Sequence, residues 1–88
     1  MEQYKQNNVT ISYAHPSPNA RIIGYLIRSE YPIKYAEGSR EQQWVRDYNA
    51  LVGTIRDISK QIKSAQIFFE GKITNNQRKE LTEIIRGD

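Results

Sequence analysis

The residues of this chain best suited to chemistry are tyrosines and basic side chains near its N-terminal end. Five of the six tyrosines lie within the first 35 residues, interleaved with arginine and lysine. Aromatic rings beside guanidinium groups can stack nucleotide bases while the cation holds a phosphate. Tyrosine is also common in strands and in protein interfaces, so the same residues fit a protein-binding surface. The candidate binding residues of this group are Tyr13, Arg28, Tyr31 and Tyr35.

A second group of candidate binding residues surrounds two prolines, at positions 16 and 18. It consists of His15, Asn19 and Arg21. Loops held by strands often carry binding residues, which is why we include this segment. A lone histidine beside a turn is more often structural than catalytic, and none of the serines or carboxylates lies at a diagnostic spacing from it.

Motifs for enzymatic chemistry are missing from the sequence. It has no cysteine, one histidine and no glycine-rich phosphate loop. We therefore expect a protein that is not an enzyme, with no catalytic residue, no metal and no cofactor.

A third candidate site is a basic patch formed by Arg56, Lys60 and Lys63. Their spacing places them together on one side of a helix, where they could neutralise phosphates. An ordinary solvated face is the alternative, because Asp47 and Asp57 dilute the charge. The formal net charge of the 88-residue chain is only +3. It permits an anionic partner without requiring one.

The element that must position these sites is a long stretch of helical periodicity. Apolar residues recur at alternating intervals of four and three from Trp44 to Phe69, which is typical of one face of an amphipathic helix. The seam is either the core of the monomer or an interface between subunits. The residues that we assign to an oligomer interface are Trp44, Tyr48, Leu51, Ile55, Ile58, Ile62 and Phe69.

The expected length of this helix favours the oligomer. A helix from Ser39 to Gln66 would be ~40 Å long, whereas a compact chain of 88 residues is ~30 Å across. A helix that overhangs its own domain leaves apolar residues in water unless a second subunit covers them. We therefore expect a homo-oligomer, most simply a dimer. A break at Gly53 would remove the overhang and weaken this argument.

Two strands are expected before the helix. Val9, Ile11 and Tyr13 alternate with smaller residues over positions 9–14, which is the pattern of a half-buried strand. A loop spans residues 15–20. Residues 21–28 are apolar on both alternating faces, so they form either a buried strand that completes a hairpin or two turns of helix. Residues 29–38 contain either a third short edge strand or a crossover.

Helix boundaries are indicated by capping patterns. Ser39 and Gln42 have the spacing of a capping box, as do Thr74 and Gln77, which predicts a last helix over residues 74–86 that ends at Gly87. The expected fold class is α+β: an N-terminal β-hairpin, with or without a third short strand, packed on a long amphipathic helix and followed by a short C-terminal helix.

The expected organisation is a single domain over residues 1–88. Its parts are a flexible tail over 1–8, a β-hairpin region over 9–35, the long helix over 39–69 and the C-terminal helix over 74–86. No apolar run approaches the ~20 residues that cross a bilayer, so we expect a soluble, cytoplasmic protein.

The function expected from these features is that of a small oligomeric regulator, inhibitor or scaffold that occupies the surface of a protein partner. The alternative is binding of nucleic acid or a nucleotide, through the basic helix face and the hairpin rich in tyrosine and arginine.

Overall fold

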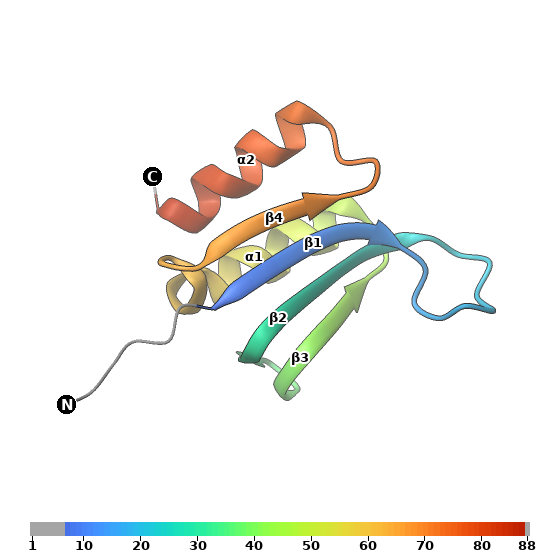
Figure 1. Cartoon of the computed structure of the whole chain (residues 1–88), viewed down its shortest axis with the longest axis horizontal. Coiled ribbons are helices and arrows are strands. Elements are labelled where there is room, and N and C mark those ends of the chain that lie inside the picture. Colours follow the sequence, from blue (N-terminus) through green and yellow to red (C-terminus); the bar gives the residue numbers. More distant parts are fainter. Residues whose placement is uncertain (1–6, 88) are drawn as a thin grey trace.

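Four strands form one mixed sheet in the computed structural model, which describes residues 7–87. Along the sheet their order is β3-β2-β1-β4 (Figure 1). β2 lies antiparallel to both β1 and β3, whereas β4 lies parallel to β1. The strands are β1 (Asn8–Ala14), β2 (Gly24–Tyr35), β3 (Gly38–Val45) and β4 (Gln66–Glu70). Together with two helices in the described residues, this sheet confirms the expected α+β class.

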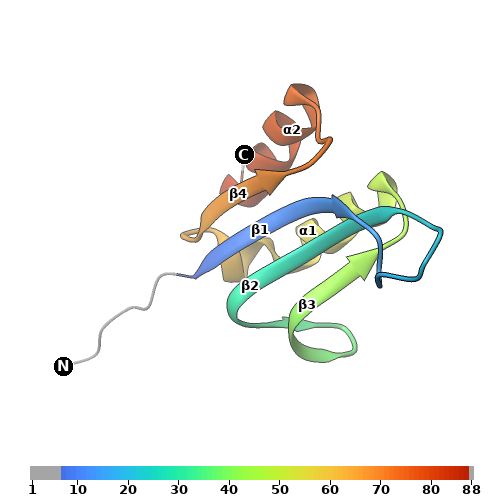
Figure 2. The same cartoon turned by 45° about the vertical axis from the view of Figure 1, so that its right-hand side comes forward.

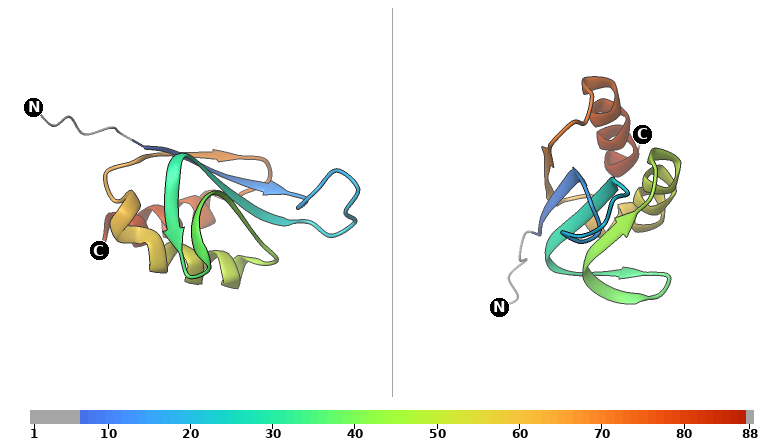
Figure 3. Two further views of the ribbon diagram at one scale, coloured as in Figure 1. Left: turned by 90° about the horizontal axis from the view of Figure 1, so that it is seen from below. Right: turned by 90° about the vertical axis from the view of Figure 1, so that its right-hand side faces the viewer.

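Both helices lie on the same side of the sheet (Figure 3). The first, α1 (Tyr48–Ile62), connects β3 to β4, and the second, α2 (Asn75–Arg86), follows β4 and packs on α1. The core fills the space between the sheet and these helices. Its largest fully buried side chains are Val9, Ile11, Ile27, Ile33, Leu51, Ile55, Ile58, Ile62, Leu81 and Ile85.

The N-terminal hairpin forms as predicted, because β1 alternates between the two faces of the sheet. Val9 and Ile11 point toward the helices and are fully buried, while Thr10 between them is half-buried on the other face. β1 pairs along its length with the first half of β2, from Ala14 opposite Gly24 to Val9 opposite Ser29. Residues 21–23 belong to the connecting loop rather than to a strand.

The first half of β2 lies between β1 and β3, whereas its second half pairs with β3 alone, and the strand is irregular between these two halves. The pairing register with β3 shifts between Arg28 and Ile33. Two side-chain amides bind the β2 backbone around this irregular stretch. Asn7 accepts from the N–H of Tyr31 and donates to its carbonyl, and Gln61 does the same for Lys34. The backbone of this stretch is thus hydrogen-bonded without a neighbouring strand.

The predicted long helix over residues 39–69 is wrong at its N-terminal end. Residues 38–45 form β3, and Ser39 pairs with β2 instead of capping a helix. The helix cap is Asp47, whose carboxylate accepts a hydrogen bond from the backbone N–H of Ala50 at 2.8 Å. The sequence has no apolar residue between Ser39 and Trp44, so the apolar spacing that predicted the helix begins only at Trp44.

The predicted long helix is also wrong at its C-terminal end. α1 ends at Ile62, and a turn leads to Ala65 and then to β4. The helix does not break at Gly53, which lies on its exposed side with open space where a side chain would be. With 15 residues, α1 is ~22 Å long and does not overhang the domain.

The predicted C-terminal helix is confirmed. Thr74 accepts from the backbone N–H of Gln77, and the Gln77 side chain accepts from the N–H of Thr74, which completes the capping box. Gly87 ends the helix in a left-handed conformation, with φ of 85°. Only glycine adopts this conformation without steric cost, which explains the sharp end of α2.

Part of the predicted N-terminal tail is structured. Asn7 binds the backbone of Tyr31, and Asn8 begins β1, whereas residues 1–6 lie outside the described residues. Among the helices of residues 7–87, none is both long and apolar enough to cross a membrane.

Candidate binding surface

The face of the sheet opposite the helices carries a mixture of polar and apolar side chains, and we call it the uncovered face. Its residues are fixed by the strand register, because partners in a ladder point to the same side. One row across the sheet contains Phe68, Thr10, Arg28 and Gln42, and the next contains Glu70, Ser12, Leu26 and Trp44. In Figure 2 no helix lies over this face of the four strands.

Three of these side chains provide the apolar part of the uncovered face. Phe68 on β4 exposes 48% of its surface, and Leu26 and Trp44 are half-buried. Large apolar groups at this exposure mark interaction surfaces when they occur together, although single ones are ordinary. Here they lie on one surface, at its two edges and in its middle.

Trp44 is fixed in place on the uncovered face. Its indole N–H donates to the carbonyl oxygen of Ala14 at 2.9 Å, so the ring reaches from β3 across β2 to the end of β1. This close packing is possible because Gly24 has no side chain: a Cβ at this position would lie 2.2 Å from the carbonyl oxygen of Val45 and 2.7 Å from the indole ring. Trp44 is therefore a rigid aromatic anchor, the type of residue that often dominates binding energy in interfaces.

Charged residues of both signs lie on the uncovered face. Arg28 and Glu70 form a salt bridge of 3.8 Å that passes over β1. Glu30 and Glu41 line a hollow of this face together with Thr10 and Arg28. Arg28 consequently has a carboxylate beside it, which weakens its use as a phosphate-binding cation.

The loop between β1 and β2 extends the uncovered face beyond the end of the sheet (Figure 1). In it, Ile22 and Ile23 expose 48% and 36% of their surfaces. His15 donates from Nδ1 to the carbonyl oxygen of Ile22 at 2.6 Å and so closes the base of the loop. The expectation that residues 21–28 form one buried strand is wrong at these two isoleucines.

The predicted binding residues do not form one site. His15, Asn19 and Arg21 lie exposed in the loop, and Arg28 lies on the uncovered face. Tyr31 is 38% exposed in the irregular stretch of β2. The other two candidate tyrosines serve the core: Tyr13 packs on Tyr25 with ring centroids 5.3 Å apart, and Tyr35 is buried on the helix side.

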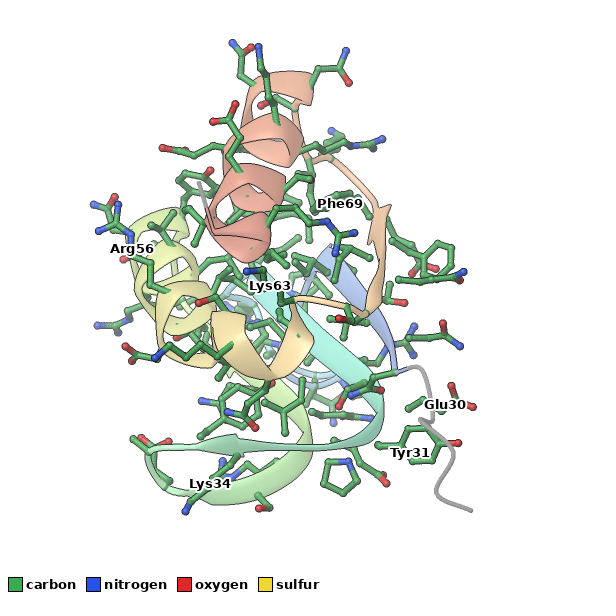
Figure 4. The ribbon with its side chains drawn as sticks, turned by 90° about the vertical axis from the view of Figure 1, so that its left-hand side faces the viewer. Glu30, Tyr31, Lys34, Arg56, Lys63 and Phe69 are labelled. Carbon is green, nitrogen blue, oxygen red and sulfur yellow. The ribbon has the colours of Figure 1, made fainter. Side chains whose placement is uncertain are left out.

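The predicted basic patch lies elsewhere. Arg56 and Lys60 are exposed on α1, and Lys63 is exposed just after its end. Helix α1 lies on the side of the sheet opposite the uncovered face. Figure 4 shows Arg56 and Lys63 away from Tyr31 and Lys34 in the second half of β2. A nucleotide site that combines the hairpin tyrosines with this patch is therefore not assembled.

The residues predicted as an oligomer interface are mostly parts of the core. Leu51, Ile55, Ile58 and Ile62 are fully buried between α1 and the sheet, so they are not available to a second subunit. Tyr48 and Phe69 are partly buried and pack against the same core, and Trp44 lies on the uncovered face. The fully buried residues of this seam leave no exposed surface for the expected assembly, and oligomerisation stays a prediction.

A cleft of about 490 Å³ separates the tip of the β2–β3 hairpin from α1. Charges of both signs line it: Lys34 lies near Glu37 and Asp57. Tyr35 also lines the cleft, and its hydroxyl is buried without a hydrogen-bond partner in the described structure. Burial raises the pKa of Tyr35 to about 12. Such a mixed lining does not indicate a particular ligand.

Tyr48 is a second tyrosine with a raised pKa, and it connects the two helices. The Tyr48 hydroxyl donates to Glu80 on α2. Burial raises the pKa of Tyr48 well above its usual value, and the hydrogen bond and the negative charge of Glu80 raise it further. This contact is structural, because it joins α1 to α2 within the molecule.

Metal sites are not formed by the described residues, which include no cluster of three histidine, cysteine or acidic side chains placed to hold an ion. The residues that sequence reasoning missed are Leu26 and Phe68 as members of the uncovered face, and Ile22 as an exposed loop residue. In residues 66–70 the polar Gln66 and Glu70 alternate with the apolar Ile67 and Phe69. This alternation has the period of a strand and was the signal for β4. Nothing in the sequence marks Ile22 as exposed.

Comparisons of this chain with protein-family models, with curated protein sequences and with solved structures found no match. Its function is therefore argued from the geometry of its surfaces.

Proposed function

We propose that this protein is a non-enzymatic binding module that docks a protein partner on the uncovered face of its sheet. The observation that carries the proposal is the apolar surface formed by Phe68, Leu26 and Trp44, continued by the exposed isoleucines of the loop. Interfaces between proteins typically bury a few aromatic and aliphatic anchors within a polar rim. Thr10, Ser12 and Gln42 supply such polar neighbours.

The charge of this face supports a protein partner over a nucleic acid. Binding to nucleic acid depends on cations that neutralise phosphates. Arg28 on the uncovered face is salt-bridged to Glu70, and Glu30 and Glu41 line the hollow beside it. The alternative function uses Arg56 and Lys60 on α1 and Lys63 just after it, which are exposed, and it predicts binding that weakens steeply as salt is raised.

The test is purification of the tagged protein from cells of its own organism, comparing surface variants. In the test variant Phe68→Ser is combined with Ile22→Ser, and in the matched control Lys60→Ala is combined with Lys63→Ala. We expect a stoichiometric protein partner to be retained by the wild type and the control and lost from the test variant. Far-ultraviolet circular dichroism verifies that all three are folded.

Two results would contradict the proposal. One is a partner that remains bound to the Phe68 and Ile22 variant. The other is recovery of nucleic acid that is lost from the lysine control and released by salt. A native mass measurement of the purified wild type in the same experiment separates a homo-oligomer from a complex with another protein.

A further inference from the structure

The outer edge of β4 is an unpaired strand edge. In the sheet β4 has β1 as its one neighbour, so its other side is open. Gln66 donates its backbone N–H to Asn7, on the β1 side. Because backbone direction alternates along a strand, Ile67 and Phe69 direct their N–H and carbonyl groups to the open side. A row of such groups is a template for an additional strand.

The two edges of the sheet are not equally protected. β3, at the other edge, carries Arg40 and Glu41, and charged residues on an edge strand discourage pairing with other chains. In β4 the one charged residue is Glu70, at the last position of the strand, and apolar residues lie on both faces of the strand. It is therefore the edge more suited to accept an added strand.

Helix α2 gives this edge a positive charge. Arg78 lies over the ring of Phe69, with its guanidinium carbon 5.7 Å from the ring centroid. Figure 4 shows the Phe69 side chain between β4 and α2. At the other end of the helix, Arg86 donates to the carbonyl oxygens of Lys63 and Ala65, just before β4. One arginine thus stands near each end of β4, on the helix side.

Neither guanidinium is neutralised by a carboxylate. Within residues 7–87 the one salt bridge joins Arg28 to Glu70. Arg78 contacts a carbonyl oxygen and the Phe69 ring, and Arg86 contacts carbonyl oxygens. Arg78 and Arg86 are eight residues apart on one helix, which is a rise of ~12 Å along its axis, and their side chains leave the helix ~80° apart around it. In an extended chain, two side chains four residues apart point to the same face at a separation of ~13 Å.

We propose that the β4 edge binds an extended segment of a partner protein as a fifth strand. The segment carries two acidic side chains four residues apart, which pair with Arg78 and Arg86. Ile67 and Phe69 supply the main-chain hydrogen bonds, and the two arginines select the acidic side chains. This site is distinct from the uncovered face and shares with the proposed function the premise that the partner is a protein.

The test uses the synthetic peptide Thr-Glu-Thr-Val-Thr-Glu-Thr, blocked at both ends, in which the two glutamates are four residues apart. Its fluorescein-labelled form is titrated with the protein, and binding is read by fluorescence anisotropy. We expect saturable binding, and we expect a version with glutamine in place of both glutamates to bind about tenfold more weakly.

Protein variants locate the charged contacts. Arg78→Gln and Arg86→Gln should each weaken peptide binding about threefold to fivefold. The control Lys79→Gln lies on the same helix, is exposed and should leave binding unchanged. Because Arg86 also binds the turn after α1, circular dichroism must show that its variant remains helical. If it does not, Arg78→Gln alone carries the test.

Methylation of peptide nitrogens separates main-chain pairing from mere electrostatic attraction. Alternate residues of an added strand direct their N–H groups toward β4, so N-methylation of one alternating set should weaken binding about tenfold and that of the other set should be tolerated. Because the glutamates must face the arginines, the residues whose N–H groups point toward β4 differ between a parallel and an antiparallel added strand. The methylated set that weakens binding therefore also reports the direction of the bound peptide.

The inference is overturned if the glutamine peptide binds as well as the glutamate peptide, or if both methylated sets bind like the unmodified one. It is also overturned if a second copy of this chain occupies the edge, which would appear as a dimer with protected Ile67 and Phe69 amides in hydrogen exchange. The Ile22→Ser variant, which lies far from β4, should bind the peptide normally. Failure here is thus distinguishable from failure of the uncovered-face proposal.

Discussion

The two faces of the sheet are built from the same strands but have different compositions and consequences. Along β1, Val9 and Ile11 are fully buried toward the helices, and Thr10 and Ser12, which alternate with them, face the other side. The helix side is filled with isoleucine, valine and leucine. The uncovered face has polar residues interrupted by a few large apolar ones. One alternating strand, with a period of two residues, therefore supplies side chains both to the core and to the uncovered face.

The comparison teaches where changes should affect folding and where they should affect binding. Side chains on the helix side contact α1 or α2, so their removal leaves a cavity. Exposed residues of the uncovered face, such as Phe68 and Gln42, lose little when truncated because water already contacts them, whereas Ser12 on the same face is buried. Trp44 and Gly24 are a further exception, since they are packed against each other on the uncovered face.

The largest expected difference between the faces comes from truncation of a core residue. Ile55→Ala should lower the free energy of unfolding by about 2–5 kcal/mol, because Ile55 is fully buried between α1 and the sheet. Phe68→Ser, on the uncovered face, should cost about 1 kcal/mol or less. Urea denaturation followed by circular dichroism measures both values. Equal losses would show that the uncovered face is also part of the folding core.

A smaller effect is expected where the uncovered face is tightly packed. Gly24→Ala places a methyl group against Trp44 and the backbone of Val45, so it should destabilise the protein by about 1–3 kcal/mol and change the tryptophan fluorescence. The matched control is Gly53→Ala, in open space on α1, which should stabilise by about 0.5–1 kcal/mol. If both alanines are tolerated, β3 can move away from β2 together with Trp44, and Trp44 is not a rigid anchor.

The sequence predicts well those elements whose signals are local. The alternation of residues 9–14 defines β1, and the capping box at Thr74 with Gly87 defines α2 within one residue. Side-chain period and caps act over a few residues, so no tertiary information is needed.

The failed predictions share one cause, which is an apolar spacing that continues across element boundaries. Trp44, Ala65 and Phe69 extend the seam of α1 by coincidence, although they lie in β3, in a turn and in β4. Asp47 was the better cap signal, because a carboxylate there can accept from the first turn. A strand of five residues such as β4 is fixed by pairing with β1, which is distant in the sequence.

The candidate site was harder to predict than the fold, because it depends on exposure. Tyr13 and Tyr35 are as suitable chemically as Tyr31, but packing against the helices removes them from the surface. Conversely, Phe68 and Ile22 look like core residues in the sequence and are exposed in the structure. Exposure follows from which face the helices cover, and that is a property of the whole chain.

The smallest expected effects come from two tyrosine hydroxyls on the helix side. Tyr35 is 6% exposed and its hydroxyl has no recorded partner, whereas the hydroxyl of Tyr48 donates to Glu80. Tyr35→Phe should therefore stabilise the protein by about 1 kcal/mol, and Tyr48→Phe should destabilise it by a similar amount. Urea denaturation at pH 7 tests the pair, since both tyrosines are neutral there.

Alkaline pH provides an independent check on Tyr35. Its pKa is about 12 in the folded protein against 10 when exposed, so between these values the unfolded chain releases a proton that the folded chain keeps. The stability of the wild type should therefore fall as pH rises from 10 toward 12. In Tyr35→Phe this fall should be smaller. An identical pH dependence in wild type and variant would mean that the Tyr35 hydroxyl reaches water in the folded protein. The helix side of the sheet would then be open to water at Tyr35, unlike the fully buried core beside it.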